Sequence, residues 1–173
     1  MSIDRVEGLV YGVQDVETCT RFLDDWGMEK VEAGKTGAIY RTLENQLLTL
    51  RKLDDPGLPA GVEKGSTVRE VVWGVDSDES LANISADLSK DREVIEHKDG
   101  SLHTYDVLGI AIAFQVKDEA EFTDEVPVLN YRSHEPRLNR TMENTQEVRI
   151  RPYRIGHVVY NHAAEQREKA VAF

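Results

Sequence analysis

Two kinds of hydrophobic spacing alternate along the first half of the chain and predict its elements. Val6 to Val13 is a run of branched and apolar residues typical of a buried strand. From Val16 to Trp26 the apolar residues recur at helical spacing, with Asp15 in front as an N-cap and Gly27 behind as a helix terminator. Three short strand-like runs follow, "MEKVEA", "GAIYRTL" and "QLLTLRKL", separated by turn residues. The pattern predicts a βαβββ unit over residues 5–53.

The same order of elements returns further along the chain. Shifted by 62 positions, "VEGLVYGVQDVE" aligns with "VREVVWGVDSDE", and five of the twelve positions are identical. A helix-like segment that begins at Ser77 or Asp78 follows, and then the strand-like runs "REVIEH", "SLHTYDVL" and "IAIAFQVK". We interpret residues 68–117 as a second βαβββ unit that arose by duplication. Two unrelated valine-rich strands are the alternative.

The pattern weakens after the second unit. Residues 118–152 are polar, contain three prolines and keep neither a helical nor a strand period, which predicts an extended connector. "YRIGHVVYN" then has the composition of a strand and precedes a helix-like end, so a third copy is expected to start there. Setting Gly156 over Gly8 places Leu9 and Val71 at the position of His157. Because this copy holds less than half of a unit, we expect a fragment whose tail packs on the first domain or adds to the sheet edge of a second copy.

Composition narrows the class of protein. The formal charge of −11, with 40% hydrophobic and 31% charged residues, is typical of an acidic globular protein and disfavours nucleic acid as a partner. Basic residues are in the majority only after residue 128, where 8 Lys/Arg stand against 5 Asp/Glu. The lone Cys19 excludes an intramolecular disulfide and a thiolate metal site, and its helical spacing predicts a place in the core. Without an apolar run of ~18 residues or a signal-like N-terminus, we expect a cytoplasmic protein with no membrane partner.

Tandem βαβββ units, with "GLVYGV" opening the first and "GHVVY" opening the third, resemble the vicinal oxygen chelate superfamily, which includes glyoxalases, bleomycin-resistance proteins and extradiol dioxygenases. The two-unit first domain, the connector with "PRLNR" and a following histidine are most similar to the two-domain extradiol ring-cleaving dioxygenases. The resemblance implies an α+β fold in which the units form an open bowl of strands with helices outside. It divides the chain into a domain at 1–117, a connector at 118–152 and the start of an incomplete second domain at 153–173.

The resemblance also implies a chemistry. Extradiol enzymes hold a non-haem metal, Fe(II) or Mn(II), with two histidines and a glutamate, which leaves positions for a catechol-like aromatic substrate and dioxygen. His157 in "GHVVY" matches the first of these histidines, and the other two ligands have no counterpart in the chain. Leu9, Val71 and Gln115 stand where the first two units would carry ligands, so residues 1–117 are expected to bind no metal. The activity belongs to the complete protein, and the chain as given is expected to be inactive.

Other interpretations stay open. One is a non-catalytic ligand-binding module of the bleomycin-resistance type, whose bowl takes an aromatic or peptide ligand, and another is a metal-dependent glyoxalase-like isomerase or lyase. His97 and His103 flank a predicted turn and are interpreted as exposed hairpin residues rather than as a metal pair with Asp106. His134 falls in the connector, and His162 follows the last predicted strand. A homo-oligomer also stays open.

Overall fold

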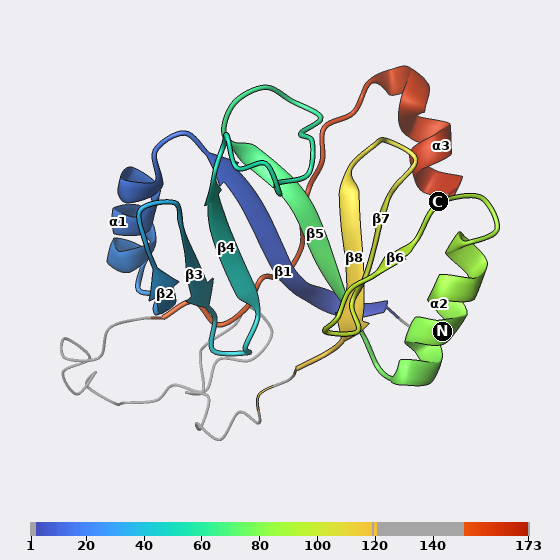
Figure 1. Ribbon diagram of the computed structural model, residues 1–173, viewed down its shortest axis with the longest axis horizontal. Coiled ribbons are helices and arrows are strands. Elements are labelled where there is room, and N and C mark those ends of the chain that lie inside the picture. Colours follow the sequence, from blue (N-terminus) through green and yellow to red (C-terminus); the bar gives the residue numbers. More distant parts are fainter. Residues whose placement is uncertain (1–2, 119, 121–150, 173) are drawn as a thin grey trace, which may run out of the picture.

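A mixed eight-stranded sheet organises residues 3–118, 120 and 151–172, the part of the chain that the computed structural model describes (Figure 1). Its strands run in the order β2-β3-β4-β1-β5-β8-β7-β6. The first half contains β1 (Ile3–Val13), α1 (Val16–Trp26), β2 (Glu29–Ala33), β3 (Gly37–Arg41) and β4 (Leu47–Lys52). The second half contains β5 (Thr67–Val75), α2 (Asp78–Leu88), β6 (Ile95–Glu96), β7 (Leu102–Tyr105) and β8 (Ala111–Val116). The 3-10 turn η2 (Ala164–Gln166) and α3 (Arg167–Ala172) follow in the tail.

The two halves of the sheet repeat one path. Each half is built as strand, helix and three strands, with its first strand parallel to its last, as β1 is to β4 and β5 is to β8. The two first strands, β1 and β5, run antiparallel in the middle of the sheet and join the halves. The predicted α+β fold of tandem βαβββ units is confirmed, and the sheet is open rather than closed.

Each main helix begins where the sequence predicts it, because a side-chain oxygen caps its first turn. Asp15 accepts a hydrogen bond from the Thr18 backbone N–H at 2.9 Å, and Ser77 accepts one from the Ser80 backbone N–H at 3.3 Å. α1 ends at Gly27, whose φ of 87° lies in the left-handed region that favours glycine. None of the helices in the described ranges has the length and apolar character needed to cross a membrane.

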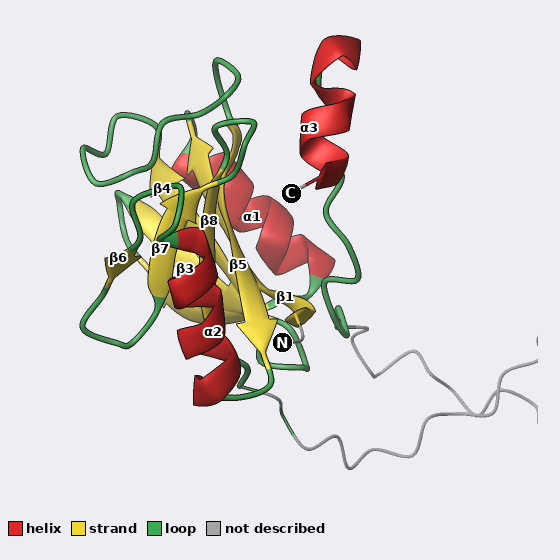
Figure 2. Cartoon of the chain, turned by 90° about the vertical axis from the view of Figure 1, so that its right-hand side faces the viewer, coloured by secondary structure: helices red, strands yellow, loops and turns green. Residues whose placement is uncertain are grey.

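Both helices pack on the same face of the sheet, which we call the helix face. α1 and the strands of the first unit share a core cluster of Val13, Val16, Leu23, Met28, Ala38, Tyr40, Leu48 and Leu50. α2 and the strands of the second unit share a cluster of Val75, Ile84, Leu102, Ile112 and Phe114. Because side chains alternate along a strand, the residues between these core positions lie on the opposite face, which we call the open face. In Figure 2 the tail with α3 stands on the side of the sheet where α1 lies.

The tail does not form the strand predicted from "YRIGHVVYN", because residues 151–163 have no regular secondary structure. Three of its side chains instead pack on buried residues of the central strands: Ile155, Val158 and Tyr160 on Val6, Leu9 and Val71. Both central strands already have a neighbour on each side, so they offer the tail no free edge to pair with. The tail therefore packs apolar side chains on the helix face without joining the sheet, and in Figure 1 it passes behind the sheet.

A buried amide fixes the tail on the first unit. Gln46, which is 1% exposed, accepts a hydrogen bond from the Ile155 N–H at 2.6 Å and donates one to the Ile155 carbonyl at 3.1 Å. Backbone N–H groups of Leu43 and Glu44 donate to the carbonyls of residues 152 and 153. The prediction that the tail packs on the first domain is confirmed. The division into domain, connector and second domain stays a prediction, and most of the connector lies outside the described residues, as does His134.

Candidate functional site on the open face

β5 places a carboxylate on the open face of the sheet. Val71 is fully buried on the helix face, so its neighbour Glu70 points to the opposite side. On β1 the corresponding open-face residue is Gly8, whose backbone lies opposite Val72. Leu9 and Val71, which the sequence aligns with His157, both pack on the helix face. Their equivalence with a ligand position stays a prediction.

Aligning the aromatic residues of the two units and the tail gives a second register. Each of these three segments has one aromatic residue directly after a valine: Tyr11, Trp73 and Tyr160. Counting back three positions from each aligns Gly8, Glu70 and His157. The position that is histidine in the tail is thus glycine in the first unit and glutamate in the second.

Glu70 meets His103 across an intervening strand. The Oε1 atom of Glu70 lies 2.8 Å from Nδ1 of His103, although β8 separates β5 from β7. Two strand spacings amount to about 10 Å, so both side chains must extend over β8 to meet. Ala111 and Ala113, the β8 partners of Glu70 and His103, are small enough to leave that space. The pair is largely buried, with side-chain exposures of 11% for Glu70 and 21% for His103.

Hydrogen bonds on both sides fix the orientation of the His103 ring. The Ser101 hydroxyl donates to Asp99 at 2.6 Å and lies 2.8 Å from Nε2 of His103. On the other side, Nδ1 of His103 lies 2.8 Å from the Glu70 carboxylate, which can accept a hydrogen bond from it. The Ser101 hydroxyl and N–H hold the pKa of Asp99 below its usual value.

Serine, histidine and glutamate occur here in the order of a nucleophilic triad, but the geometry does not support that chemistry. Ser101 is only 5% exposed, and its proton is held by Asp99 rather than by the imidazole. A nucleophilic serine needs a neighbouring base that takes its proton and room for a substrate. The arrangement instead fixes the orientation of the His103 ring. His97 adds to it by stacking on His103, with ring centroids 3.8 Å apart.

A cavity of about 380 Å³ lies against this charged cluster. Its floor includes Glu70, His103 and Ala111, and one wall is the loop at residues 56–59, with the sequence Pro-Gly-Leu-Pro. Tyr105, which is 49% exposed, stands at its border. The cavity thus joins an apolar wall to a buried ion pair, a combination common in sites for small molecules.

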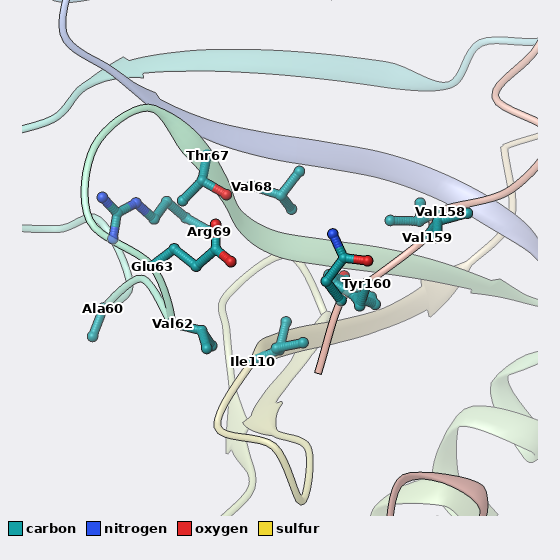
Figure 3. A pocket seen from close by; sticks show the side chains of 11 residues that line it. Ala60, Val62, Glu63, Thr67, Val68, Arg69, Ile110, Val158, Val159 and Tyr160 are labelled. Carbon is teal, nitrogen blue, oxygen red and sulfur yellow. The ribbon is translucent and has the colours of Figure 1, made fainter. Parts of the chain in front are cut away.

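A second cavity, of about 210 Å³, opens where the tail crosses the start of β5 (Figure 3). Thr67 and Val68 line it from β5, and Val158 and Tyr160 line it from the tail. Within the described residues, the buried hydroxyl of Tyr160 has no hydrogen-bond partner. Burial raises the pKa of Tyr160 well above its usual value, with a further contribution from Asp106. We regard this cavity as a packing gap under the tail.

The histidines noted in the sequence differ in exposure and in their partners. His97 is exposed as predicted, whereas His103 is half-buried and paired with Glu70 rather than lying free on a hairpin. Asp106 joins neither of them, because its carboxylate accepts two backbone N–H bonds in the turn before β8. His157 and His162 are exposed in the tail, and the metal-ligand role of His157 stays a prediction.

Sequence alone missed Glu70. The available signal was a charged residue inside the otherwise branched and aromatic strand "VREVVWGV", where a carboxylate is unusual. Gln115, predicted to stand in place of a ligand glutamate, lies half-buried near the end of β8 beside Gly74.

No protein-family model matches the sequence, and neither does any curated protein. The fold is similar to that of solved structures. An Mn(II)-bound glyoxalase from Novosphingobium aromaticivorans is 16% identical with a TM-score of 0.54, over 72% of this chain and 43% of that one. A homoprotocatechuate 2,3-dioxygenase variant from Brevibacterium fuscum is 16% identical with a TM-score of 0.55, over 69% of this chain and 34% of that one. A catechol 2,3-dioxygenase is 14% identical with a TM-score of 0.51, over 65% of this chain and 40% of that one.

These similarities establish the fold of glyoxalases and extradiol dioxygenases, as the sequence resemblance implied. The chain spans less than half of the length of each of these proteins. Across residues 3–118, 120 and 151–172, no three His, Cys, Asp or Glu side chains come close enough to hold a metal ion. The described residues by themselves therefore do not fit the metal that this fold carries in the glyoxalase.

Proposed function

We propose that this chain forms part of an extradiol-type dioxygenase that cleaves catechol-like aromatic substrates with dioxygen and a non-haem metal, Fe(II) or Mn(II). The observation that carries the proposal is the tandem βαβββ sheet, which matches a dioxygenase over 69% of this chain and 34% of that protein. A metal-dependent isomerase or lyase of the glyoxalase type would share the fold and would consume no oxygen.

In this proposal the two described units act as a scaffold without a metal. Gly8 has no side chain to offer, and Glu70 is committed to His103. His157 is the proposed metal ligand, and it is exposed on a segment that Gln46 fixes to the first unit. One imidazole is not a metal site, so the remaining ligands must come from outside the described residues.

Oxygen uptake by the product of the complete reading frame tests this proposal. With a catechol and either Fe(II) or Mn(II), wild-type protein is expected to consume oxygen and form a ring-opened product. His157→Ala should abolish uptake, because loss of a ligand removes a coordination position. His162→Ala, an exposed histidine five residues away, is the matched control and should retain activity. Unchanged oxygen uptake in His157→Ala would refute the assignment.

A further inference from the structure

We propose that the open-face cavity at Glu70 and His103 binds a small organic cation, such as a primary amine or a quaternary ammonium group. This inference concerns the second unit and the loop that precedes it, and it does not depend on dioxygenase activity or on a metal.

The charges around the cavity favour a positive ligand. Glu70 and Glu93 line it, and none of its lining residues is a lysine or an arginine. His103 contacts Glu70 on one side, and on the other it contacts the serine that is bonded to Asp99. Three acidic residues, Glu70, Glu93 and Asp99, thus lie in or beside the cavity. The formal charge of −11 on the whole chain acts in the same direction.

Glu70 also keeps acceptor capacity for a ligand. A carboxylate offers about four lone-pair sites, and within the described residues the Glu70 side chain makes one hydrogen bond, from Oε1 to His103. Its second oxygen can therefore accept an N–H from a ligand. Because the side chain is only 11% exposed, such a charge-assisted bond would be weakly screened by water.

The walls of the cavity suit an apolar body attached to the cation. Pro56, Leu58 and Pro59 form one side, and the Tyr105 ring stands at the border. A tyrosine ring attracts a cation over its face, and the volume of about 380 Å³ lies in the range of small-molecule sites. The ligand that fits is an ammonium head on Glu70 with an apolar or aromatic group against the proline-rich loop.

Other ligand classes fit less well. An anion would meet two lining carboxylates and no lining lysine or arginine. A divalent metal would lack a third ligand, since no group of three metal-binding side chains exists in the described ranges. A neutral aromatic alcohol could bond to Glu70 but would leave the excess negative charge uncompensated.

Calorimetric titration with three probes of one shape tests the proposal on metal-free protein. Benzylammonium is expected to bind at least about tenfold more tightly than benzyl alcohol, and benzoate should not bind measurably. Ring resonances of His97 and His103 should shift on binding, which locates the site. Equal affinity for benzylammonium and benzyl alcohol would overturn the proposal, as would no binding of benzylammonium at about 10 mM.

Two isosteric variants distinguish binding at Glu70 from general attraction to a negatively charged surface. Glu70→Gln should weaken benzylammonium binding about ten- to hundredfold. Glu96→Gln removes the same charge from an exposed residue of β6 that does not line the cavity, and it should change affinity less than about twofold. Equal losses in both variants would mean diffuse attraction and contradict the proposal. Should Glu70→Gln fail to fold, Tyr105→Leu, at an exposed position, provides the second test and should also weaken binding.

Discussion

The two units share one backbone path and differ in the chemistry of their open faces. Equivalent strand positions carry Gly8, Ile39 and Leu47 in the first unit and Glu70, His103 and Ala111 in the second. In the second unit a carboxylate and an imidazole meet over a small alanine. In the first unit a glycine and an isoleucine flank a leucine, so no ion pair can form there. The two units thus share a fold and differ in this site.

The helix faces, in contrast, have stayed alike. Each unit buries aliphatic residues of its first and last strands under its own helix, and these clusters form the core of the described structure. Burial of such side chains is the main favourable term in folding, so substitutions on this face are constrained in both units. The open face is not needed for packing a helix, and it is where the two units could diverge.

The largest predicted difference in stability between the two faces is at two adjacent valines of β5. Val71 is fully buried against the tail on the helix face, whereas Val72 is half-buried on the open face. Val71→Asp should lower the free energy of unfolding by about 4 kcal/mol or more, because it buries an unpaired charge. Val72→Asp should cost clearly less. Urea unfolding of both variants measures the difference, and equal costs would contradict the assignment of the two faces.

A second prediction replaces the ion pair of the second unit with apolar residues like those of the first. His103→Ile should cost about 2–3 kcal/mol of unfolding free energy, because it leaves the Glu70 carboxylate buried without its partner. The double variant Glu70→Leu/His103→Ile should recover most of this loss, since no buried charge remains. A double-mutant cycle by urea unfolding measures the coupling. Additive costs would indicate that the two side chains do not interact.

Much of the fold could be predicted from the sequence because its signals are local. Helical spacing, a capping Asp15 and a terminating Gly27 define α1 without reference to the rest of the chain. The repeat then transfers the same interpretation to the second unit. The tail was predicted as a strand because its composition is that of a strand. Whether a free sheet edge exists for it depends on the strand order, which is not a local property.

The candidate site was beyond the reach of local patterns for a similar reason. Glu70 and His103 are 33 positions apart, and they meet only because β8 inserts between their strands. Their contact further requires alanines at the two facing positions of β8. His103 could be noticed in the sequence, but its partner could not be named. Side-chain packing also decides which strand residues reach the open face, because aromatic residues that pack on the helix face leave their neighbours on the other side.

The third prediction uses a buried phenol that is found in the first unit only. Tyr40 is 0% exposed, and its single hydroxyl proton lies between two acceptors, the Asp24 carboxylate at 2.9 Å and the Thr20 carbonyl at 3.0 Å. Thr104 stands at the equivalent position of the second unit. Burial, followed by the Asp24 carboxylate, raises the pKa of Tyr40 to about 12. The unfolded pKa is about 10, so the folded state favours the neutral phenol. Its stabilising contribution is complete below pH 10 and is lost as pH rises towards 12.

Tyr40→Phe should therefore flatten the alkaline loss of stability. Between pH 10 and 12, wild type is expected to lose about 2 kcal/mol more unfolding free energy than the variant. At pH 7 the variant should be less stable by about 1–2 kcal/mol, because the hydroxyl that bonds to Asp24 is gone. Urea unfolding at several pH values measures both effects. Parallel pH profiles for the two proteins would contradict the raised pKa.

The smallest predicted effect compares the tail with the units on which it packs. The Tyr160 ring packs on the central strands, and its buried hydroxyl has no hydrogen-bond partner within the described residues. A buried hydroxyl without a partner costs desolvation energy, so Tyr160→Phe should keep the packing and raise the unfolding free energy by up to about 1 kcal/mol. Tyr105→Phe removes a hydroxyl from an exposed side chain and should change stability by less than about 0.5 kcal/mol. Thermal and urea unfolding of both variants decide the point. A destabilised Tyr160→Phe would mean that the hydroxyl has a bonding partner, and that contact would then add to the polar contacts that Gln46, Leu43 and Glu44 make with the tail.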